Sequence, residues 1–295
     1  AASDADLGIA GGVESMSRAP YVMGKAESAF GREQRLEDTT MGWRFVNPRM
    51  HASHGVDSMT QTAENLAREL SIARADQDAY ALCSQRRTQQ ALADGVFAAE
   101  LIALPPSQGE PGASADEQPR ADTTLAKLAA LPPLLGPGTT ITAGNASGIN
   151  DGACALLLAS DAALARWRLE PLARVLGTAS AGVAPRIMGI GPVAAATRLL
   201  ARLGLHLDDF GRIEINEAFA AQVLAVTRAL GLPDDAAHVN PNGGAIALGH
   251  PLGASGARLA LTATRELERS GLRRALLAMC VGVGQGVALA IERPS

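Results

Sequence analysis

NPNGGAIALGHPLGASG, at residues 240–256, is the stretch that most constrains this 295-residue chain. Its glycines permit backbone bends and close approaches that other residues avoid, and a helix-like run, ARLALTATREL, follows. A second glycine-rich stretch, CVGVGQG at residues 280–286, ends an apolar run. Loops of this kind can bring His250 and Cys280 together, and such a pair can share proton transfer on a substrate carbon. These two stretches predict an enzyme.

Working outward, strand-like apolar runs alternate with helical patterns, most clearly after residue 142. The predicted helices include 192–204, which has Pro192 in its first turn and Gly204 at its end. The other predicted elements are strands at 153–159, 171–178 and 212–215, helices at 218–230 and after 256, and a hairpin of 275–281 with 286–291. Alternating strands and helices indicate an α/β layered architecture.

The first half of the chain is less regular. A buried strand is predicted at 7–12, ending in a Gly-Gly turn, and 18–47 reads as a long ordered excursion. Two helices are predicted within 62–95, the second capped by Ser71 or Asp76 and stopped by Gly95. The most linker-like stretch is PPSQGEPGASADEQP, at residues 105–119.

Composition narrows the classes of function. The chain is 47% hydrophobic and 19% charged with a net charge of −4, which indicates a globular protein with no basic stripe for nucleic acid. No apolar run approaches the ~20 residues that span a bilayer. The three cysteines, Cys83, Cys154 and Cys280, are too widely spaced for a disulfide framework or a metal site. We therefore expect no metal, no membrane partner and a cytoplasmic location.

Five motifs occur in the order found in the thiolases. They are GGVESMSRAP at 11–20, TAGNASGINDGA at 142–153, NEAFAAQ at 216–222, NGGAIALGHPLGASGAR at 242–258, and CVGVGQG. The chain therefore resembles the thiolase family over nearly its whole length. ESMSRAPYVMGKAESAF and DTTMGWRFVNP (38–48) are similar to the members that cleave β-ketoadipyl-CoA in aromatic catabolism.

The resemblance implies a five-layered α-β-α-β-α fold with an inserted loop domain. It assigns 1–18 and 150–168 to the N-terminal thiolase domain, 19–149 to a CoA-binding loop domain, and 169–295 to the C-terminal domain. Thiolases carry a nucleophilic cysteine in an N-R-x-C-x-S-G-like segment, which this sequence does not contain. We expect the chain to begin shortly downstream of that segment, with the N-terminal half-domain largely missing, and to be inactive in isolation.

The resemblance also implies catalytic roles. His250 would activate the nucleophilic cysteine, and Cys280 would move the proton on the α-carbon of the acetyl unit. Asn216 would hold a water that forms an oxyanion hole with His250, and the Gly282 N–H would donate to a second oxyanion hole. We expect the pKa of the Cys280 thiol to be brought toward neutrality. The alternatives are that Asn216 is a turn or helix-cap residue and that Gly282 serves only the hairpin.

For CoA, the family pattern points to Ser147, Ala143 and Met59, with Phe219 lining the pantetheine tunnel. Arg120 would meet the adenine or its phosphates, or is simply a solvated loop arginine. CoA is a substrate here, and no cofactor is expected.

The resemblance implies CoA-dependent cleavage of a 3-oxoacyl-CoA, 3-oxoadipyl-CoA giving succinyl-CoA and acetyl-CoA, by a homo-oligomer (dimer or tetramer). The alternative is a non-catalytic remnant that binds CoA esters or pairs with a complete subunit. A nucleotide-dependent oxidoreductase is disfavoured, because GVGQG lies between two β runs and opens no helix.

Overall fold

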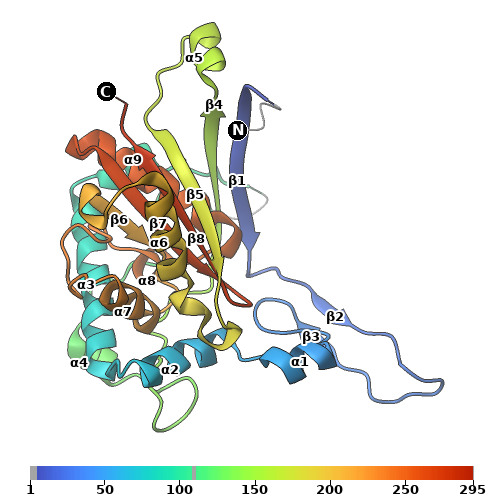
Figure 1. Cartoon of the computed structure of the whole chain (residues 1–295). Helices are drawn as coiled ribbons and strands as arrows, with labels where there is room; N and C mark the ends of the chain where they lie inside the picture. Colours follow the sequence, from blue (N-terminus) through green and yellow to red (C-terminus); the bar gives the residue numbers. More distant parts are fainter. Residues whose placement is uncertain (1–4, 108–110, 295) are drawn as a thin grey trace.

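The computed structural model describes residues 5–107 and 111–294. Its centre is a four-stranded sheet in the order β5-β8-β7-β6, in which β6 and β7 are parallel and the other pairs antiparallel (Figure 1). The strands are β5 (Arg174–Gly182), β6 (Arg212–Ile215), β7 (Arg274–Val281) and β8 (Gln285–Glu292). The predicted hairpin of β7 and β8 is confirmed.

Helices cover both faces of this sheet. Successive side chains of a strand point to opposite faces. Leu276 and Cys280 of β7 accordingly pack in the larger core with α6 and α7, whereas Ala275 and Leu277 pack against α9. The elements around the sheet are η2 (Pro185–Ile190), α6 (Gly191–Leu203), η3 (Leu207–Asp209), α7 (Ala220–Ala229), α8 (Ala245–Leu248) and α9 (Leu252–Ser270).

A second, two-stranded sheet lies on the other side of α9. β1 (Leu7–Ser15) pairs antiparallel with β4 (Asp151–Ala159), and α5 (Asp161–Trp167) follows β4. Both strands contact α9, so helices α6 and α7, the large sheet, α9 and the small sheet form four successive layers. The predicted α/β layered architecture is confirmed. The domain boundaries stay a prediction.

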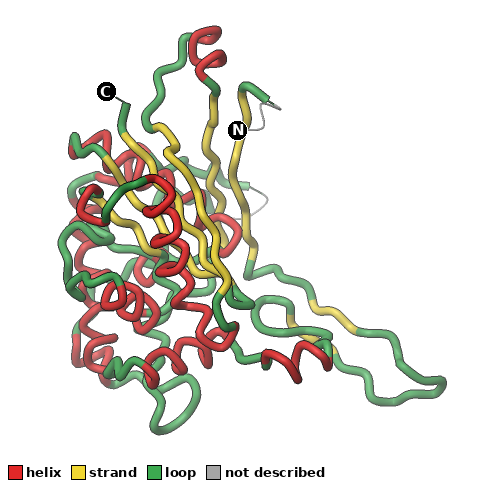
Figure 2. Tube along the Cα trace, viewed as in Figure 1, coloured by secondary structure: helices red, strands yellow, loops and turns green. Residues whose placement is uncertain are grey.

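An extended arm leaves the body after β1. It holds β2 (Tyr21–Met23), β3 (Leu36–Asp38) and α1 (Pro48–His54), and it is mostly loop (Figure 2). The chain then returns to the body through α2 (Met59–Glu69), α3 (Arg74–Ala93), η1 (Val96–Ala99) and α4 (Leu125–Ala129).

Several predicted boundaries are wrong for identifiable reasons. The Gly-Gly pair does not end β1 but lies inside it. Gly12 is required there by packing and not by a turn, because a Cβ at this position would overlap the carbonyl oxygen of Gly253 on α9. Neither Ser71 nor Asp76 caps α3. The N-cap is Ala73, without a side-chain hydrogen bond, and Ser71 lies in the left-handed region at φ 52°.

Two other elements are displaced. β5 begins and ends later than 171–178, and α9 begins at Leu252, well before Gly256. Part of the predicted 105–119 linker, residues 108–110, lies outside the described residues.

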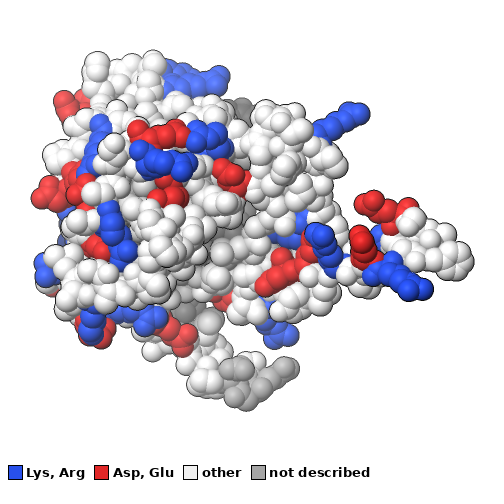
Figure 3. Space-filling view, turned by 90° about the horizontal axis from the view of Figure 1, so that it is seen from below, with Lys and Arg blue, Asp and Glu red and all other residues white. Residues whose placement is uncertain are grey.

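In the part of the chain that is described, no helix is long and apolar enough to cross a bilayer. On the face seen from below, acidic and basic side chains are intermixed (Figure 3).

Candidate active site

The site forms where β6 and β7 end side by side. Asn216 directly follows β6, and its N–H donates to the carbonyl of Ala278 on β7 over 3.0 Å. Cys280 lies near the end of the same strand, β7. Because parallel strands end at the same edge of a sheet, Asn216 and Cys280 are brought to one place.

His250 reaches Asn216 from the glycine loop between α8 and α9. The His250 Nε2 lies 3.2 Å from the Asn216 Nδ2. Its Nδ1 lies 2.6 Å from the Ser255 Oγ, and its backbone N–H donates to the Asn150 Oδ1 over 3.2 Å. The histidine is therefore held at both ring nitrogens and at the backbone.

Burial sets the charge of His250 and Cys280, the two residues predicted to transfer protons. Burial, aided by the Arg258 guanidinium, lowers the pKa of His250 to about 4, so the ring is neutral at pH 7. Burial raises the pKa of the Cys280 thiol to about 12. The expectation of a thiol pKa near neutrality is therefore wrong: the apolar core around Cys280 disfavours the thiolate. Cys280 is a neutral thiol that can give a proton to carbon.

Glu217 ties the site to the rest of the fold. Its buried carboxylate accepts hydrogen bonds from Tyr80 (2.9 Å) and Ser84 (2.7 Å) on α3. It also accepts from the Asn240 side chain (3.0 Å) and from the Ile246 N–H (3.1 Å). The Glu217 carboxylate, next to Asn216 in the chain, thus joins helix α3 to helix α8, which precedes the His250 loop.

Gly282 lies in the turn between β7 and β8. Its neighbour is Met59, whose Sδ is 4.0 Å from the point where a Cβ on Gly282 would sit. Met59 is the first residue of α2, which Ser58 caps by accepting from the Gln61 N–H over 3.2 Å. The structure therefore brings Met59, predicted to bind CoA, to the predicted oxyanion donor.

Ser147 and Phe219 also meet. The N–H and hydroxyl of Ser147 both donate to the carbonyl of Ala218, over 3.0 and 3.1 Å. Phe219 forms a β-bridge with Ala146 and is the N-cap of α7, so the helix-cap alternative for Asn216 is wrong. Ala143 lies exposed in the preceding turn.

Arg120 is placed differently. Its N–H donates to the Gln85 side chain on α3 over 3.0 Å. Its side chain is exposed, at a cavity of about 350 Å³ that Arg86 also lines. No hydrogen bond within the described residues connects it to Ser147 or Phe219.

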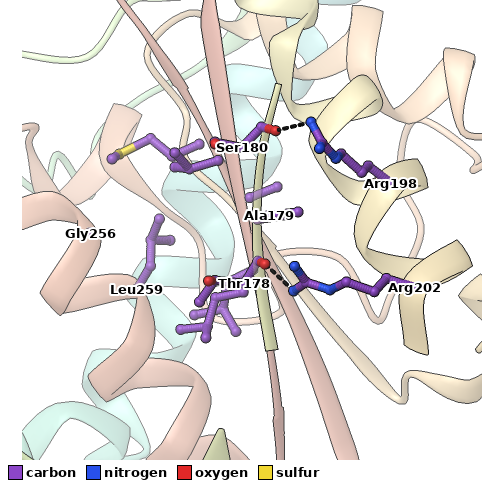
Figure 4. Close-up of a pocket in the computed structure, with 13 residues that line it drawn as sticks. Thr178, Ala179, Ser180, Arg198, Arg202, Gly256 and Leu259 are labelled. Carbon is purple, nitrogen blue, oxygen red and sulfur yellow. Dashed lines mark hydrogen bonds between the residues drawn. The ribbon is translucent and has the colours of Figure 1, made fainter. Parts of the chain in front are cut away.

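A larger cavity of about 470 Å³ lies at the edge of the sheet. Figure 4 shows Arg198 and Arg202 on one side of β5, donating to the carbonyls of Ser180 and Thr178, with Leu259 of α9 on the other side. Met279, the neighbour of Cys280, lines it as well. The cavity adjoins the site but contains none of the predicted catalytic residues.

Sequence reasoning missed three residues that hold this site: Ser255, Asn150 and Glu217. Ser255 follows His250 within the same motif, so its spacing was a usable signal. Glu217 adjoins Asn216, but nothing in the sequence shows that its carboxylate meets α3. Asn150 lies 100 residues before His250, and no local pattern joins them.

Comparison with known proteins identifies the family. The model of the thiolase N-terminal domain matches residues 1–162, and that of the thiolase C-terminal domain matches residues 169–293. The chain belongs to the thiolase family. The resemblance of its five motifs is therefore confirmed, and so is the thiolase fold.

The curated relatives are similar over nearly the whole chain. The β-ketoadipyl-CoA thiolase of Pseudomonas knackmussii is 63% identical over 295 residues, which cover 99% of this chain and 74% of the relative. The 3-oxoadipyl-CoA/3-oxo-5,6-dehydrosuberyl-CoA thiolase of Escherichia coli K12 is 57% identical over the same shares. Among solved structures, human mitochondrial 3-ketoacyl-CoA thiolase matches with a TM-score of 0.91 and 41% identity, over 99% of this chain and 73% of the human one.

Proposed function

We propose that this thiolase cleaves 3-oxoadipyl-CoA with CoA, giving succinyl-CoA and acetyl-CoA. The observation that carries the proposal is a pair of neutral groups at the adjoining ends of β6 and β7. One is Cys280, near the end of β7, and the other is His250, whose ring contacts Asn216 just after β6. Relatives 57–63% identical whose names specify β-ketoadipyl-CoA or 3-oxoadipyl-CoA support the choice of acyl chain.

The two groups fit the two proton transfers of the cleavage. His250 Nε2 takes the proton of the nucleophilic thiol implied by family resemblance, and that sulfur attacks the 3-oxo carbon. The carbon–carbon bond then breaks, and the acetyl-CoA enolate takes its α-carbon proton from the Cys280 thiol. In the second half-reaction the CoA thiol gives its proton to the Cys280 thiolate, and the CoA sulfur takes the acyl group. The sulfur of the nucleophilic cysteine, released in this step, then takes back the proton held by His250.

Fixed donors would stabilise the charge that develops on oxygen during these steps. We assign this role to Asn216, through a bound water shared with His250, and to the Gly282 N–H. Ser147, Met59, Ala143 and Phe219 would line the pantetheine path, and Arg120 would meet the nucleotide. A homo-oligomer in the cytoplasm is part of the same proposal.

The test is thiolysis of 3-oxoadipyl-CoA, followed by chromatography of the CoA esters. Both the 295-residue chain and the product of its whole reading frame are assayed, because the relatives are longer. Equal amounts of succinyl-CoA and acetyl-CoA from the whole product are expected. CoA-ester binding without turnover by the whole product, on any 3-oxoacyl-CoA, would support the non-catalytic alternative instead.

A further inference from the structure

The hydroxyl of Ser255 contacts the ring of His250 on the side opposite Asn216. Ser255 lies in the first turn of α9 and is 2% exposed. Its Oγ is 2.6 Å from the His250 Nδ1 and 2.9 Å from the carbonyl oxygen of Pro251. A hydroxyl has one hydrogen, and a carbonyl oxygen can only accept. Both contacts are hydrogen bonds only if the Ser255 hydrogen goes to Pro251 and the Ser255 lone pair faces Nδ1.

This geometry determines which ring nitrogen carries the proton. A neutral imidazole has one N–H. Because Ser255 presents a lone pair, that N–H belongs on Nδ1. On the opposite side of the ring, the Asn216 Nδ2 lies 3.2 Å from Nε2, where an amide N–H can meet a ring lone pair. This contact fits the same tautomer.

The selected tautomer is the one that the reaction needs. Free neutral histidine in water prefers the Nε2–H form, in which the nitrogen facing Asn216 would have no lone pair. We propose that Ser255 is a positioning residue that holds His250 in its Nδ1–H form, so that Nε2 is the base. The catalytic consequence rests on the proposed function, but the tautomer itself does not.

The test measures the tautomer directly by long-range ¹H–¹⁵N correlation in the product of the whole reading frame, labelled with ¹⁵N-histidine, at neutral pH. His250→Asn assigns the signal, because it removes one of the five histidines of the 295-residue sequence. The wild type should show a protonated Nδ1 and an unprotonated Nε2. Ser255→Ala should shift the population toward Nε2–H and lower kcat roughly 10–100-fold, by analogy with the loss of a hydrogen-bond partner that orients a metal-bound histidine.

Two further variants separate orientation from packing. Ser255→Thr keeps the hydroxyl and should keep the Nδ1–H form. Thr262→Ala removes another buried hydroxyl of α9, one that donates to Glu100, and should change neither tautomer nor kcat. An Nε2–H wild type, or an unchanged tautomer in Ser255→Ala, would overturn the inference. An inactive wild type with the Nδ1–H form would instead count against the proposed function alone.

Discussion

The two sheets on either side of α9 differ sharply in burial. In the large sheet, β6 and β7 are buried on both faces, and the candidate active site lies at their ends. In the small sheet, no described residue covers the face turned away from α9, where Ile9 and Val13 are 80% and 72% exposed. Packing on both faces fixes strand positions closely, so the candidate active site lies where the strand geometry is best determined.

The small sheet nevertheless makes a hydrogen bond to the start of α9, close to the candidate site. The Glu14 carboxylate of β1 accepts from the Gly253 N–H over 2.9 Å, at the start of α9 and three residues after His250. A carboxylate at a helix N-terminus is favourable both as an acceptor and toward the helix dipole. The comparison therefore predicts that substitutions in the large sheet strongly change kcat or the free energy of unfolding. Substitutions in the small sheet should change the free energy of unfolding only slightly, by an amount that depends on the face.

The largest effect is expected at His250. His250→Asn removes the proposed base at the end of the large sheet and should lower kcat for thiolysis by about 10³-fold, within the range for general bases. Steady-state assays of the whole reading-frame product measure it. The matched control is His54→Ala, at the exposed end of α1, which should leave kcat unchanged. A kcat of His250→Asn within tenfold of the wild-type value would contradict the assignment of His250 as the base.

Glu217 should give the largest loss of stability. Glu217→Ala leaves Tyr80, Ser84 and the Ile246 N–H without their acceptor, which should lower the free energy of unfolding by about 4 kcal/mol. Urea denaturation measures the change. Glu268→Ala removes an exposed carboxylate paired with Arg265 and should cost under about 0.5 kcal/mol. Equal losses for the two variants would refute the role of Glu217.

Glu214 should make stability depend on pH. Burial on the α9 side of β6 raises the pKa of its carboxyl to about 8. The folded state therefore binds a proton that the unfolded state releases, and stability present below pH 4.5 is lost as pH rises through 8. Between about pH 5 and 7.5 the loss should be about 3 kcal/mol, at 1.36 kcal/mol per unit.

Glu214→Gln should remove this loss. His250, whose lowered pKa costs stability as pH falls from 6.5 toward 4, acts in the opposite sense and is common to both proteins. Denaturant titrations of both across this range isolate the Glu214 contribution. Parallel stability curves for the two proteins would contradict it.

The smallest effects distinguish the two faces of β1. Glu14→Ala should cost about 1 kcal/mol, because the Gly253 N–H loses a charged acceptor. Val13→Ser, one residue away on the open face, should change the free energy of unfolding by under about 0.5 kcal/mol. Thermal unfolding of both variants tests the difference, and a larger loss for Val13→Ser would show that the open face is covered in solution.

Local patterns predicted the elements near the site well. The alternation of strands and helices around β6, and the turn between β7 and β8, depend on residues that are close together in the sequence. The sequence also indicated His250 and Asn216 through motifs. It did not predict the high pKa of the Cys280 thiol, because that follows from α6 and α7 packing over it. Nor did it show why the Gly-Gly pair lies within β1. The reason is that Gly253 of α9, 241 residues later in the sequence, packs directly against Gly12.

The division of labour between His250 and Cys280 is tested most directly by exchange of the methyl protons of acetyl-CoA with D₂O. Mass spectrometry follows deuterium uptake catalysed by the whole reading-frame product, by Cys280→Ser and by the control Cys83→Ser. Exchange at carbon should slow at least about 100-fold in Cys280→Ser and stay at the wild-type rate in Cys83→Ser. Wild-type exchange by Cys280→Ser would show that another group moves the proton on carbon.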